Sequence, residues 1–139
     1  MASSSDYMES AWANHVFRTS SYSKPSGLWI ALCTAATSDS STGSTITEPS
    51  GGGYTRYSTG APADATWTKA SSTINAVANA AAISWTASGG NYGTITHVAI
   101  VDASSNGNVL FHGALTASKT INDGDTFTIA IGGLTVTFS

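Results

Sequence analysis

Alternation of apolar and other residues from Leu28 to Phe138 constrains the fold of this chain more than any other feature. It begins at Leu28–Cys33, where alternate side chains share each face of an expected strand. Further short strands are expected at residues 54–59, 66–69, 73–77, 81–86, 95–101, 109–112, 119–121, 126–131 and 134–138. Turn signals rich in Gly, Asn and Asp separate most of them, and no helical pattern intervenes. The pattern predicts an all-β fold, an antiparallel β-sandwich or a jelly-roll-like domain.

The strand Leu28–Cys33 is apolar on both faces. Leu28, Ile30 and Leu32 share one face, and the residues between them share the other. We expect the core to cover one face and the N-terminal helix or a neighbouring chain to cover the other.

Before these strands, apolar residues recur at helical spacing. We expect Asp6 to cap a short helix, with Glu9 three residues later, and the helix to end near Phe17 or Arg18. A lone helix of about 12 residues is marginal in water, so its apolar stripe must pack on something. The stripe comprises Met8, Ala11, Trp12, His15 and Val16.

The sequence therefore divides into two parts. We expect residues 1–27 to form the N-terminal helix and a connector, together acting as a docking arm. Residues 28–139 would form the β-sandwich domain. Within that domain, residues 37–53 are polar and rich in Gly, so we expect a long exposed loop with too little apolar content to form core.

Charged residues are scarce, at 9% of the 139 residues, and the net charge is −3. The few Lys and Arg residues are scattered, so no basic stripe is available for nucleic acid. No apolar run approaches the roughly 20 residues that span a bilayer, and the start of the chain lacks the regions of a signal peptide. We therefore expect no nucleic-acid or membrane partner, and synthesis and folding in the cytosol.

The familiar catalytic and metal-binding motifs are absent, so we expect no enzyme activity, no metal and no cofactor. His15, His97 and His112 could meet as a zinc site, but they lack ligand spacing. Residues 122–125 offer clustered oxygens, but a turn is the better interpretation. Cys33 cannot form an internal disulfide, because it is the single cysteine, and it ends an apolar strand like a small buried hydrophobe.

The aromatic residues leave one alternative open. They could form a sugar-stacking platform, although filling the core and an interface is the favoured interpretation. The candidates are Trp12, Trp29, Trp67, Trp85, Tyr54, Tyr57 and Tyr92.

Several segments, taken in order, resemble small virion structural proteins of tailed bacteriophages, a family labelled loosely as tail-fibre or structural proteins. They are Asn14-His-Val-Phe-Arg18, Leu28-Trp-Ile-Ala-Leu-Cys-Thr-Ala35, Ser50-Gly-Gly-Gly-Tyr-Thr-Arg56, Tyr92-Gly-Thr-Ile-Thr-His-Val-Ala-Ile-Val-Asp102, Asn108-Val-Leu-Phe-His-Gly-Ala-Leu-Thr-Ala-Ser-Lys-Thr120, Asn122-Asp-Gly-Asp-Thr-Phe127 and Leu134-Thr-Val-Thr-Phe138. The resemblance implies a location in the virion and no catalytic residues.

Among virion positions, a capsid decoration (cement) protein fits a small compact chain best. Its expected partners are the major capsid protein, other virion proteins and copies of itself, in a homo-oligomer. A tail or fibre component is the alternative, as is a carbohydrate-binding β-sandwich. We expect the interface to use groups that the sandwich cannot satisfy internally. These are Tyr7, Met8, Trp12 and Phe17 in the N-terminal segment, and Tyr54 and Arg56 beside the long loop.

Overall fold

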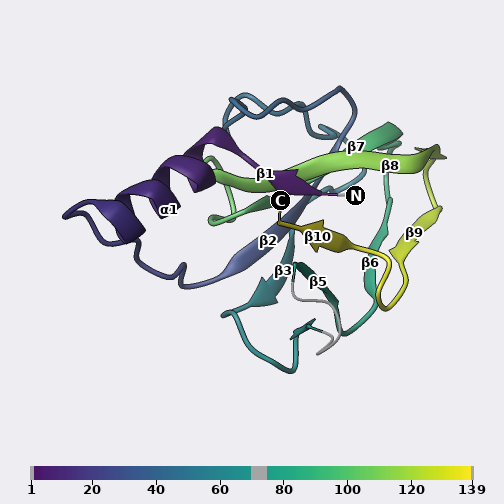
Figure 1. Cartoon of the computed structure of the whole chain (residues 1–139). Coiled ribbons are helices and arrows are strands. Elements are labelled where there is room, and N and C mark those ends of the chain that lie inside the picture. The colour runs from purple at the N-terminus through teal and green to yellow at the C-terminus, as the bar shows by residue number, and fades with distance from the viewer. Residues whose placement is uncertain (1, 70–74, 139) are drawn as a thin grey trace.

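Antiparallel pairing joins the strands of this fold, which a computed structural model describes for residues 2–69 and 75–138 (Figure 1). The largest sheet has five strands in the order β1-β8-β7-β2-β3. These strands are β1 (Ser3–Ser4), β8 (Val109–Ile121), β7 (Gly93–Val101), β2 (Leu28–Cys33) and β3 (Tyr57–Gly60).

Two smaller sheets complete the strand arrangement. One has the order β10-β5-β4, and the other pairs β6 with β9. Their strands are β10 (Thr135–Thr137), β5 (Ala76–Asn79), β4 (Trp67–Thr68), β6 (Ile83–Thr86) and β9 (Thr126–Ile129). Helix α1 (Asp6–Phe17) precedes β2. The structure thus confirms the predicted all-β antiparallel sandwich with one short helix.

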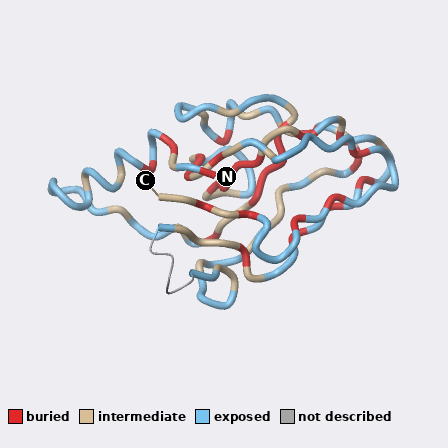
Figure 2. The backbone as a smooth tube through the Cα atoms, turned by 45° about the vertical axis from the view of Figure 1, so that its right-hand side comes forward, coloured by how far each residue is buried: buried red, intermediate tan, exposed pale blue. Residues whose placement is uncertain are grey.

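The main core lies against one face of the five-stranded sheet. Ile30 and Leu32 of β2 belong to the same buried cluster as Trp85 of β6 and Phe127 of β9. Residues that alternate along each strand therefore point into one interior, as the period of two requires. Figure 2 shows buried positions recurring along the strands, whereas helix α1 is exposed over most of its length.

The other face of β2 carries a second cluster, which the long loop covers. Ala31 and Cys33 are fully buried there beside Ala99 and Val101 of β7, and Ile46 packs against them. The expectation that residues 37–53 contribute nothing to the core is wrong, because this loop supplies Ile46. Within the chain, a loop side chain therefore covers this face, where we had expected the helix or a neighbouring chain.

Residues 109–112 and 119–121, expected as two strands, form the single strand β8 of 13 residues. Its pairing with β7 is irregular: Ile95 pairs with Lys119, but His97 pairs with Ala114. Strand β8 thus holds extra residues opposite Thr96. Because of this irregularity, one strand continues through residues 113–118, where the sequence shows no clear alternation. Residues 73 and 74 of the expected strand 73–77 lie outside the described residues, and β5 begins at Ala76.

Helix α1 begins one residue earlier than the sequence suggested. Ser5, and not Asp6, is the N-cap, because its hydroxyl accepts the N–H of Met8 at 3.2 Å. The same hydroxyl donates to the carbonyl oxygen of Val109 on β8. Asp6 lies instead in the first turn, where the helix dipole favours an acidic side chain.

The start of the chain is joined to the sandwich, which the sequence did not indicate. β1 pairs with β8, and Ala2 is 2% exposed within the main core. Ala2 also exchanges backbone hydrogen bonds with Thr135 and Thr137, each at 2.9 Å. The division into a docking arm (1–27) and a sandwich domain (28–139) stays a proposal, and any docking role belongs to the part of the arm beyond these contacts.

The helix is too short and too polar to cross a bilayer, and the described residues contain no helix that could do so.

Candidate docking surface

Helix α1 exposes apolar side chains at its C-terminal end. Val16 is 66% exposed and Phe17 is 84% exposed, although both are large hydrophobic residues. Figure 1 shows this end of the helix extending away from the sheets. An exposed apolar pair on a projecting element is typical of a surface that another chain covers.

A short series of aromatic rings fastens the helix to the sandwich. Trp12 stacks on Phe138 with ring centroids 5.3 Å apart. Phe138 in turn meets Phe111 of β8 edge-on at 5.5 Å. Trp12 nevertheless keeps 39% of its surface exposed, so it belongs both to this anchor and to the free surface. We call Trp12, Val16 and Phe17 together the helix surface.

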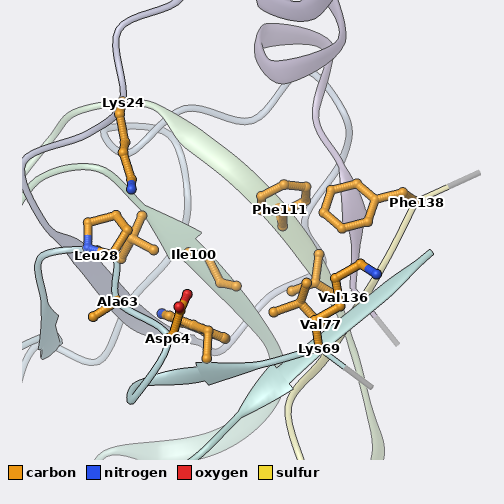
Figure 3. Close-up of a pocket in the computed structure, with 12 residues that line it drawn as sticks. Lys24, Leu28, Ala63, Asp64, Lys69, Val77, Ile100, Phe111, Val136 and Phe138 are labelled. Carbon is orange, nitrogen blue, oxygen red and sulfur yellow. The ribbon is translucent and has the colours of Figure 1, made fainter. Parts of the chain in front are cut away.

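An apolar pocket of about 320 Å³ lies beside this anchor, since Phe111 and Phe138 form part of its wall (Figure 3). Leu28, Val77, Ile100 and Val136 also line it. Lys24, Asp64 and Lys69 contribute its charged groups, and Figure 3 shows Lys24 reaching toward it from the connector. The helix surface therefore continues, through Phe138, into a hollow that can receive an apolar group.

The structure separates the predicted interface residues of the N-terminal segment. Met8 is 4% exposed and therefore belongs to the packed start of the helix. Trp12 and Phe17 belong to the helix surface, whereas Tyr7 lines a cleft between the helix and the connector. An interface role stays a prediction for all four residues, and burial makes Met8 the least accessible of them.

Arg56 has its hydrogen bonds inside the domain, so the premise for placing it at an interface is wrong. Its side chain is 4% exposed. Nε and Nη2 donate to the two carboxylate oxygens of Glu48 at 3.0 and 2.8 Å. The remaining hydrogen bonds go to the carbonyl oxygens of Gly43, Ala103 and Asn106, at 2.8 to 2.9 Å. Arg56 thus holds the long loop against the β7–β8 turn, and all its donors are used.

Tyr54 is likewise satisfied within the domain. Its hydroxyl donates to Glu48 at 2.8 Å and accepts the backbone N–H of Leu32 at 2.9 Å. Burial, and then the Glu48 carboxylate, raise the pKa of Tyr54 well above its ordinary value. The hydroxyl therefore stays protonated and bridges the loop to β2.

The three histidines occupy separate environments. His15 accepts the backbone N–H of Tyr22, His97 contacts Thr96, and buried His112 lies between Asp39 and Thr37. In the part of the chain that the structure describes, no three His, Cys, Asp or Glu side chains are grouped to hold a metal ion.

Residues 122–125 form the predicted turn between β8 and β9. Asp125 accepts the N–H of Asn122, and Asp123 accepts the N–H of Gly89, both at 2.9 Å. Gly124 has a φ of 87°, which other residues rarely adopt. The carboxylates therefore hold backbone groups of the turns.

Two of the candidate platform aromatics are core residues. Trp85 is 6% exposed and donates its indole N–H to Thr55, with Tyr57 and Phe127 around it. Tyr92 is 5% exposed. These rings are unavailable for stacking on a sugar, which supports the core interpretation for them.

Cys33 offers a test of the packing of the second cluster. Burial, and then the Glu48 carboxylate, raise the pKa of its thiol to about 12, so the thiol stays protonated below that pH. We expect folded protein at about pH 8 to react with a chromogenic disulfide reagent only as fast as it opens, whereas urea-unfolded protein reacts at once. Rapid labelling of the folded protein would contradict the burial of Cys33.

In a comparison with known families, a family model matches nearly the whole chain. Residues 3–137 match the family model described as podophage GP4 fiber I protein gp80. No curated protein matches the chain.

Proposed function

The chain belongs to the podophage GP4 fiber I protein gp80 family, and from that premise we propose that it is a non-enzymatic subunit of a virion fibre. Membership establishes a structural protein of a tailed-phage virion, in agreement with the resemblance found in the sequence. The observation that carries the proposal is the match over residues 3–137, which includes both the helix and the sandwich.

The helix surface is the proposed contact with other virion chains, including copies of this one. Val16 and Phe17 would lose their exposure to water on docking, and each buried apolar side chain of this size contributes roughly 1.5–3 kcal/mol. The scarcity of charge around the chain favours close packing, because few charged groups need to be desolvated.

A capsid decoration protein is the second candidate. It is favoured by the shape of the described residues, which form a sandwich without an elongated shaft or repeat. In that case the major capsid protein would cover the helix surface.

Labelling of the parent virion separates the two candidates. An antibody raised against the purified chain, carried on gold particles, is expected to mark fibres in electron micrographs. Even marking of the whole shell would favour capsid decoration and contradict the fibre role. A third outcome would contradict both candidates. In that case the virions bind no label, although peptides of the chain are found after digestion of host lysate, which shows that the chain is made.

A further inference from the structure

A cleft on another face of helix α1 has a chemistry unlike that of the helix surface. Tyr7, Ser10, Ala11 and Asn14 share this face, since they are spaced three, four and seven residues apart. The connector residues 20–23 form the opposite wall. The N–H of Tyr22 donates to Nδ1 of His15 at 3.0 Å and so holds the two walls together.

The cleft is large enough for a small ligand and contains no charged side chain. Its volume is about 440 Å³, within the range of roughly 300–1,000 Å³ that ligand pockets occupy. Four serines, two tyrosines and Asn14 provide hydroxyl and amide groups, and Ala11 is the one aliphatic residue of the lining. No residue of the lining supplies a counter-charge for an ion, and an apolar chain would leave these polar groups unpaired.

These polar side chains differ from other exposed hydroxyls of the molecule. Ser84 pairs with Thr128, and Thr86 pairs with Thr126, each at 2.9 Å. Within residues 2–69 and 75–138, the cleft side chains make no such hydrogen bonds with the protein, and the contact to Tyr22 uses its backbone N–H. Their donors and acceptors are therefore open to a ligand.

Two tyrosine rings accompany these open groups. Burial is the largest cause of a raised pKa of Tyr22, and the nearby Tyr7 and Asp102 raise it further. Its hydroxyl therefore stays neutral at physiological pH, able both to donate and to accept. Aromatic rings supply flat apolar faces, and the C–H faces of a sugar ring match them while its hydroxyls meet the serines.

We propose that this cleft binds a neutral saccharide between helix α1 and residues 20–23. The inference does not depend on the fibre role, because it uses a different face of the helix and a different class of ligand.

Nuclear magnetic resonance titration with three neutral trisaccharides tests the proposal: maltotriose, mannotriose and globotriose. We expect at least one of them to shift the amide resonances of residues 7–14 and 20–23 in a saturable manner. The anionic trisaccharide sialyllactose should bind more weakly than the best neutral probe.

Variants then locate the site. Tyr22→Ala should abolish measurable binding. Ser10→Ala with Ser21→Ala, which keeps both rings and perturbs folding least, should weaken it about ten-fold, as the loss of two hydrogen bonds implies. Ser118→Ala, an exposed serine on β8, is the matched control and should bind like the wild type.

Three outcomes would overturn the proposal. They are the absence of saturable shifts with all three neutral probes, shifts confined to other residues, and unchanged affinity in the double serine variant. Melting temperatures of each variant show whether lost binding reflects lost structure, and the double serine variant decides the matter if Tyr22→Ala fails to fold.

Discussion

Replacing Arg56 with Ala is expected to lower the free energy of unfolding by about 3–5 kcal/mol. The Arg56 side chain is 4% exposed and that of Glu48 is 20% exposed, so the substitution leaves a largely buried carboxylate without its counter-charge. It also leaves the carbonyl oxygens of Gly43, Ala103 and Asn106 without this donor. Urea denaturation followed by tryptophan fluorescence measures the loss.

Two further variants sharpen this result. Arg56→Lys keeps the charge but cannot form the two-pronged contact with Glu48. Its free energy of unfolding should therefore lie between those of the wild type and Arg56→Ala. Lys119→Ala removes an exposed cation from β8 and should change stability by no more than about 0.5 kcal/mol. If Arg56→Ala cost as little as Lys119→Ala, Arg56 would not hold the loops together.

Replacing Val16 and Phe17 together with Ala is expected to weaken assembly of the chain roughly a hundred- to a thousand-fold. Burial of both side chains by another chain should contribute about 3–4 kcal/mol, and each 1.4 kcal/mol corresponds to about a factor of ten. The sandwich should remain folded, because both side chains are exposed in the single chain. Binding to parent particles that lack this protein, together with the melting temperature, measures both effects.

Ile131→Ala provides the matched control for that experiment. Ile131 is 70% exposed, is a large apolar residue like Val16, and lies between β9 and β10, so it is not part of the helix surface. It should bind like the wild type. If the variant with both Val16 and Phe17 replaced bound as tightly as the wild type, another surface would be the docking surface. If its whole domain melted, the helix end would be shown to support the fold.

Local periodicity made the strands predictable. The alternation within Leu28–Cys33 and within residues 95–101 reflects two apolar faces, and both faces are buried in the structure. The N-cap was misplaced by one residue because Ser and Asp are comparably good caps, and only the contact of Ser5 with β8 distinguishes them.

Long-range contacts were not predictable from local patterns. Ile46 is a single apolar residue in a polar loop, and nothing in its surroundings indicates that it covers β2. The pairing of Arg56 with Glu48 could have been predicted. They are two opposite charges eight residues apart in a chain with 9% charged residues.

The helix stripe was partly predictable. Its spacing predicts one face that needs cover, and of that face Met8 is buried whereas Trp12 and Val16 remain exposed. Pairing of β1 with β8 fixes only the start of the helix, so its far end with Val16 and Phe17 extends past the sheet. Which residues of the stripe remain exposed thus depends on the tertiary anchor.

Cryo-electron microscopy of the parent virion tests whether the chain is a fibre subunit that docks through helix α1, because it locates every copy of the chain and its neighbours. We expect density for the sandwich within a fibre, with Val16 and Phe17 of helix α1 buried against another virion chain. A reconstruction in which this chain is absent from the fibres, or in which both side chains face solvent in every copy, would contradict it.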